Sequence, residues 1–95
     1  MKNIDVDIYM TQLKGFFEKN PNSLVELIGN MNRDDFFNKV EEQCYNNANY
    51  GNEISLTQKQ LIDIVVTMNN PDVKNVKEKV SGIFQKTRFG LISLN

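Results

Sequence analysis

Residues 57–86, TQKQLIDIVVTMNNPDVKNVKEKVSGIFQK, decide the fold. Apolar residues recur at helical spacing before a short break (Leu61, Ile64, Val65, Met68) and after it (Val73, Val76, Val80, Ile83, Phe84). Thr57 followed by Gln60 is a capping-box pattern, which is typical of a helix start. The break at residues 69–72 contains Pro71, which disfavours a helical conformation in the residue before it. We therefore predict two helices, residues 58–68 and 73–86, joined by a four-residue turn.

Three further helices are predicted upstream of this pair. The first runs from residue 5 or 7 to residue 19 and ends before Pro21. The second covers residues 24–30 and is capped by Asn22 or Ser23. The third begins after Asn32 and carries acidic residues in its first turn, where the helix dipole favours negative charge. The polar residues 46–52 are predicted to form a turn.

Two short strands complete the expected fold. Ile54 and Leu56 alternate with polar residues, which predicts a strand over residues 53–57. Residues 89–95 predict a second strand, with Leu91 or Ile92 turned inward. We found no repeat and no linker, so the 95 residues are expected to form one domain. The predicted fold class is a mainly α, small helical domain with a minimal two-stranded β element.

From residue 32 onward, the predicted order is helix, strand, helix, turn, helix, strand. This order resembles the winged helix-turn-helix family. The resemblance implies that residues 53–57 pair with residues 90–94, and that residues 1–31 form an N-terminal helical extension to a winged-helix-like unit at 32–95. In this family the third helix of the unit enters the major groove of DNA. Here that helix is the one predicted at residues 73–86.

The resemblance assigns nucleic-acid contacts to polar side chains on and just after that helix: Lys74, Asn75, Lys77, Ser81, Gln85, Lys86 and Arg88. The lysines would contact phosphates, and the amides of Asn75 and Gln85 can read adenine. Charge supports the assignment, because residues 70–95 hold five basic and two acidic residues, whereas residues 1–69 hold six basic and ten acidic ones. The expected function is a nucleic-acid-binding, specifically DNA-binding, accessory or regulatory protein.

An alternative interpretation needs no nucleic acid. The lysines of residues 73–86 then form an ordinary solvated helix face. The chain would be a non-enzymatic protein-interaction or assembly module that binds a protein partner or forms a homodimer. The first predicted helix, with Ile8, Leu13, Phe16 and Phe17, is apolar enough to form such an interface.

Composition excludes several chemistries. The chain has no His, no Trp and the single cysteine Cys44, which removes the Ser-His-Asp triad, the Cys-His pair, His-ligated metals and an intrachain disulfide. Cys44 follows Phe37 and Val40 on one apolar stripe, which indicates a packing role. We therefore expect no enzyme, no metal, no cofactor and no small-molecule substrate. The first residues lack the apolar core of a signal peptide, and we expect an intracellular, cytoplasmic protein with no membrane partner.

Overall fold

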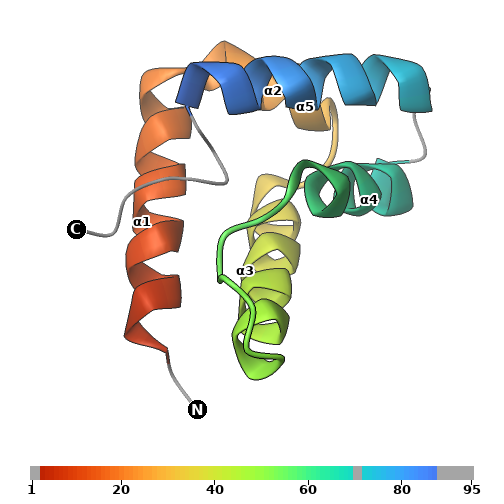
Figure 1. The fold of residues 1–95 in the computed structure, drawn as a ribbon. Coiled ribbons are helices and arrows are strands. Elements are labelled where there is room, and N and C mark those ends of the chain that lie inside the picture. The colour runs from red at the N-terminus through yellow and green to blue at the C-terminus, as the bar shows by residue number, and fades with distance from the viewer. Residues whose placement is uncertain (1–2, 70–71, 88–95) are drawn as a thin grey trace.

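The structure, a computed structural model, describes residues 3–69 and 72–87 of the chain (Figure 1). These residues form five α-helices, in the order α1 (Ile4–Lys19), α2 (Pro21–Ile28), α3 (Arg33–Asn49), α4 (Gln58–Asn69) and α5 (Val73–Thr87). In Figure 1, α1 and α3 run side by side, α4 is seen nearly end-on, and α5 lies across the top of the molecule. The α5 helix packs on both α4 and α2.

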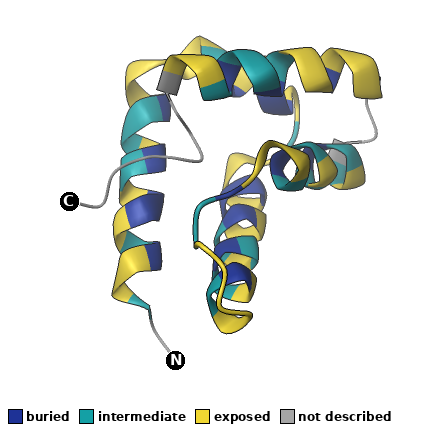
Figure 2. Cartoon of the chain, in the orientation of Figure 1, coloured by how far each residue is buried: buried dark blue, intermediate teal, exposed yellow. Residues whose placement is uncertain are grey.

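One hydrophobic core holds the helices together. Its fully enclosed side chains come from α1, α3, α4 and α5 and, at Leu56, from the segment before α4, and the largest include Tyr9, Phe17 and Phe36. Phe17 and Phe37 bring their rings to 6.0 Å, which joins α1 to α3 through a tilted aromatic contact. The buried stripes of the helices face one another across the interior, as the dark blue segments of Figure 2 show.

The starts of the first three helices follow local chemistry. The Asn3 side chain caps α1 by accepting hydrogen bonds from the backbone amides of Asp5 (2.9 Å) and Val6 (3.3 Å). Asn32 caps α3, as predicted, by accepting from Asp35 at 3.0 Å. The helix predicted at residues 24–30 with a cap at Asn22 or Ser23 is wrong at both ends, because α2 begins at Pro21 and ends at Ile28. Proline has no amide hydrogen to lose and a backbone angle that suits the first helical position.

The predicted turn over residues 46–52 is only partly correct, since α3 continues to Asn49. The turn is confined to the residues that follow, where Gly51 has a positive φ of 76°. The Asn52 amide donates to the Asn47 carbonyl at 2.9 Å and the Gly51 amide to the Ala48 carbonyl at 3.0 Å. This pair of bonds is a Schellman motif, which satisfies the last carbonyls of the helix.

The predicted capping box at the start of α4 is confirmed. The Gln60 backbone amide donates to Thr57 Oγ1, and the Thr57 backbone amide donates to Gln60 Oε1, both at 3.1 Å. Helices α4 and α5 each extend one residue beyond the predicted ends at 68 and 86.

The predicted strand over residues 53–57 is wrong, and no strand occurs within residues 3–69 and 72–87. The carbonyls of Ile54 and Ser55 both accept from Asn47 Nδ2, at 3.5 and 3.4 Å. Consecutive carbonyls alternate in direction along a strand, so this shared donor is compatible only with a bend. The second predicted strand, residues 89–95, lies outside the described residues. The mainly helical fold is thus confirmed, whereas the two-stranded element is not supported and the winged-helix resemblance remains a prediction.

Candidate functional site

The α5 helix has one buried side and one side open to solvent. Val76, Val80 and Ile83 are buried against the core, since α5 packs on α2 and α4. A step of 100° per residue places Lys74, Glu78 and Gln85 on the opposite side of the helix. All three are exposed. The apolar stripe of α5 therefore fixes which polar side chains point outward.

The structure describes six of the seven residues that the sequence assigned to nucleic-acid contact, and Arg88 lies outside the described part. Five of the six are exposed (Lys74, Asn75, Lys77, Gln85, Lys86), and Ser81 is half-buried. We refer to these six residues as the α5 surface. All six residues lie on one helix, so the helical repeat alone sets the spacing between them.

The α5 surface divides into two flanks. Asn75 and Lys86, together with Lys79, border a cavity of about 260 Å³ between α2 and α5. Glu26 of α2 and Glu78 of α5 border the same cavity. Lys74, Lys77 and Ser81 project along the other flank by helical geometry. We call the side with Asn75, Lys79 and Lys86 the α2 flank, and the side with Lys74, Lys77 and Ser81 the outer flank. The α2 flank mixes both signs of charge, whereas the residues of the outer flank are basic or neutral and have Glu78 beside Lys74 at their edge.

The lysines of α5 lack ion-pair partners within the described part of the chain. The Lys39–Glu42 pair, at 3.5 Å, lies on α3 and involves no lysine of α5. Asp72 uses its Oδ1 to accept a hydrogen bond from the Lys74 backbone amide at 3.1 Å, so this carboxylate caps α5. The ammonium groups of the α5 lysines therefore remain available to bind an anion of another molecule.

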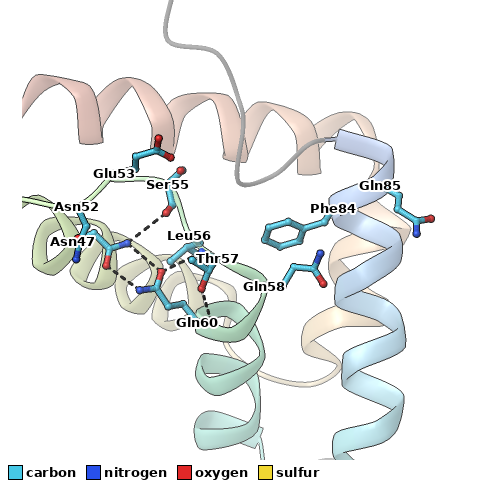
Figure 3. Close-up of a pocket in the computed structure, with 10 residues that line it drawn as sticks. All are labelled: Asn47, Asn52, Glu53, Ser55, Leu56, Thr57, Gln58, Gln60, Phe84 and Gln85. Atoms are coloured by element: carbon cyan, nitrogen blue, oxygen red, sulfur yellow. Dashed lines mark hydrogen bonds between the residues drawn. The ribbon is translucent and has the colours of Figure 1, made fainter.

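A larger groove lies between the start of α4 and the end of α5 (Figure 3). Its volume is about 680 Å³, within the range of small-molecule pockets. In Figure 3 the Phe84 ring and the Gln58 side chain face each other, with Leu56 and Thr57 beside them. The described residues that line the groove are Asn47, Asn52, Glu53, Ser55, Leu56, Thr57, Gln58, Gln60, Phe84 and Gln85.

A cluster of three side-chain amides, Gln43, Asn47 and Gln60, supports this groove from below. Asn47 is 5% exposed and is the one buried polar residue among the described positions. Its Nδ2 donates to Gln60 Oε1 (3.1 Å), and its Oδ1 accepts from Gln60 Nε2 (2.9 Å) and Gln43 Nε2 (3.0 Å). Since the same Nδ2 contacts the two carbonyls of the bend, the amide cluster fixes the groove wall formed by residues 54–57.

Two buried titratable groups lie beneath the groove wall and are held neutral. Tyr9 is fully buried, and its hydroxyl accepts from the Leu56 amide at 3.1 Å. Burial raises the pKa of Tyr9 above its ordinary range, against a lowering effect of that hydrogen bond. Burial, with repulsion from Glu41, raises the pKa of the Cys44 thiol to about 12. A neutral, enclosed thiol is a poor nucleophile, so the packing role predicted for Cys44 fits its surroundings.

Sequence reasoning missed the groove and its support. The polar composition of residues 46–52 predicts a turn at Asn47, although Asn47 follows Val40 by seven residues and Cys44 by three, which places it on the buried stripe of α3. That spacing is the available signal. The apolar pattern of residues 73–86 predicts Phe84 in the core stripe, and the structure leaves it half-buried at the groove.

Comparisons of the chain with protein-family models, with curated proteins and with solved structures gave no match. Among the helices that the structure describes, none combines the length and the hydropathy needed to cross a bilayer. Within the same residues, His, Cys, Asp and Glu side chains do not gather in threes or more at metal-binding distance.

Proposed function

We propose that the chain is a non-enzymatic nucleic-acid-binding protein that contacts the phosphate backbone through its α5 surface. The observation that carries the proposal is the state of the α5 lysines. Lys74, Lys77 and Lys86 are exposed, and no carboxylate within the described residues pairs with them. Lysines in this state neutralise phosphates and release counterions, which supplies most of the affinity for nucleic acid.

The arrangement of α4 and α5 also supports the proposal. The two helices pack on each other, and residues 70–72 connect them. Figure 1 shows α4 beneath α5, and the two helices follow one another in the chain. Two successive packed helices joined by a few residues match the element order of a helix-turn-helix, in which the second helix meets the DNA. Asn75 and Gln85 would then supply amides for adenine contacts.

A fluorescence anisotropy titration with labelled duplex DNA at two salt concentrations tests the proposal. We expect affinity to fall steeply with salt, with a logarithmic slope of roughly −0.9 for each phosphate neutralised. The triple variant Lys74→Glu, Lys77→Glu, Lys86→Glu should lose binding. A matched control reverses three exposed charges on other elements, Lys19→Glu, Arg33→Glu and Lys59→Glu. Absence of binding at low salt, or equal losses in both triple variants, would contradict the proposal.

The second candidate function is a protein-interaction or assembly module without nucleic-acid contact. The α2 flank favours it, because Glu26 and Glu78 lie among its lysines and would repel phosphate. Sedimentation equilibrium from low to high micromolar concentration checks whether the chain assembles with itself. A concentration-dependent mass together with no DNA binding would favour this candidate over the first.

A further inference from the structure

We propose that the groove between α4 and α5 binds a peptide segment that carries an apolar anchor residue next to a basic residue. This site goes beyond the proposed nucleic-acid function and does not depend on it. The groove reaches the α5 surface only at Gln85, which Figure 3 shows pointing away from the groove interior. The lysines of α5 do not line it.

The apolar anchor follows from the position of Phe84. Its ring is half-buried and borders the groove together with Leu56, which is 1% exposed. An apolar side chain placed between them would remove the remaining exposed face of the ring from water. Pockets that bind an anchor side chain in this way dominate the energetics of peptide and protein recognition.

The peptide backbone is the partner that matches the rest of the lining. Asn52 and Gln58 present side-chain amides, each of which is both a donor and an acceptor. A peptide backbone likewise offers one donor and one acceptor for most residues. Ser55 and Thr57 add hydroxyl groups of the same dual character. A lining of this kind can bind a peptide without a fixed sequence at every position.

Charge selects a basic residue in the peptide. Glu53 is exposed and is the one charged residue among the described residues that line the groove. Among the described lining residues a phosphate or nucleotide would meet a carboxylate and no cation, whereas a lysine or arginine beside the anchor would be attracted.

Selection from a library of phage-displayed random heptapeptides on the full chain tests the proposal. We expect the selected peptides to share an apolar residue next to Lys or Arg. Synthetic fluorescein-labelled versions of them are then titrated by anisotropy. Gln58→Trp should fill the groove and abolish measurable binding, whereas Asn38→Trp, an exposed change on α3, should leave it unchanged. Glu53→Lys should weaken binding about two- to fivefold, as for an exposed ion pair. Glu18→Lys, with the same change in net charge, should not.

The controls also separate this site from the α5 surface. Gln58→Trp and Glu53→Lys leave the α5 lysines in place, so DNA titrations of these variants report on the proposed function independently. Failure to enrich any peptide motif, or equal binding of the selected peptides by Gln58→Trp and Asn38→Trp, would overturn the proposal. So would a wild-type dimer that Gln58→Trp converts to a monomer, because the groove would then hold a second copy of the chain.

Discussion

The side chains of Asn47 and Gln60 pair with each other in both directions across α3 and α4. Asn47 Nδ2 donates to Gln60 Oε1 at 3.1 Å, and Gln60 Nε2 donates to Asn47 Oδ1 at 2.9 Å. A reciprocal amide pair needs both side chains in one register. It therefore fixes how the end of α3 and the start of α4 meet.

Removing either member of this pair should destabilise the fold. We expect Asn47→Ala and Gln60→Ala each to cost about 1–3 kcal/mol, because each leaves a partly buried amide without its partner. The double variant should cost less than the sum, since the pair is lost only once. Urea denaturation followed by circular dichroism measures these values. Asn46→Ala, an exposed neighbour on α3, is the control, with an expected change below about 0.5 kcal/mol. Strict additivity would show that the two amides are not coupled.

The buried hydroxyl of Tyr9 should contribute more to the stability of the fold than the exposed hydroxyl of Tyr50. Tyr9→Phe keeps the ring but leaves the buried Leu56 amide without the acceptor that it has at 3.1 Å. We expect a loss of about 1–3 kcal/mol in the free energy of unfolding. Tyr50, which is 82% exposed, provides the matched change. Thermal melts should show a lower midpoint for Tyr9→Phe and an unchanged one for Tyr50→Phe. Equal midpoints for the two variants would contradict the role of this bond.

Stability should fall in alkaline solution, and Cys44 should account for the onset. The pKa of its thiol rises from an ordinary value of 9.0 to about 12 in the folded chain. Below pH 9 both states keep the proton, and between pH 9 and 12 only the unfolded state releases it. The unfolded state is thus favoured as pH rises, by up to about 1.4 kcal/mol per pH unit for one proton.

Urea denaturation at pH 8 to 10 measures this dependence. Cys44→Ala should decrease less steeply with pH than the wild type between pH 9 and 10, whatever its overall stability. Tyr9, whose ordinary pKa is 10.0, should add its own contribution only above that pH. Parallel curves for the variant and the wild type would rule out a buried neutral thiol.

Two glycines should respond to alanine with opposite signs. Gly51 has a φ of +76°, a conformation that alanine adopts only with strain, so Gly51→Ala should destabilise by roughly 1 kcal/mol. Gly82 lies inside α5, and a Cβ placed there meets no atom within 4 Å. Gly82→Ala should therefore stabilise by about 0.5–1 kcal/mol. Chemical denaturation of both variants is the measurement. A destabilised Gly82→Ala would mean that α5 needs the glycine for close approach.

The two flanks of α5 should contribute unequally to DNA binding. On the outer flank, the double variant Lys74→Ala, Lys77→Ala should reduce the salt slope by about 1.8, since each lysine neutralises a phosphate. On the α2 flank, Lys79→Ala, Lys86→Ala should reduce it less, because Glu26 and Glu78 border the same cavity. Anisotropy titrations over several salt concentrations give both slopes. A larger effect on the α2 flank would place the nucleic acid on the opposite side of the helix.

The helices could be predicted from the sequence because their signals are local. Asn32 caps α3, the pair Thr57 and Gln60 caps α4, and each apolar stripe covers one face of a single element. The errors at 46–52 and 53–57 share one cause. Asn47 reaches Ser55 and Gln60 from another helix, and this contact keeps residue 47 helical and bends the backbone at 54–55. The spacing of Asn47 from Val40 and Cys44 carries part of this information, whereas no pattern within residues 53–57 does.

The candidate sites show the same division. The α5 surface could be predicted because Val76, Val80 and Ile83 point inward and so define the outward side. The groove could not, since residues 52–60 and residues 84–85 line it together and are brought together only by the packing of α4 on α5. The residues that line the groove do not follow a regular spacing in the sequence, so no motif predicts them.

Gln60 gives the folding of this chain an unusual dependence. Its Oε1 accepts a hydrogen bond from the Thr57 backbone amide, which caps the start of α4. The same atom accepts a hydrogen bond from Asn47 Nδ2, which attaches α3. The start of one helix and its attachment to another thus use the same atom. A chain in which α4 has formed but α3 has not docked keeps this cap but leaves the Gln60 side chain without its Asn47 partner. Folding of the two helices should therefore be cooperative, without a stable intermediate that contains α4 alone.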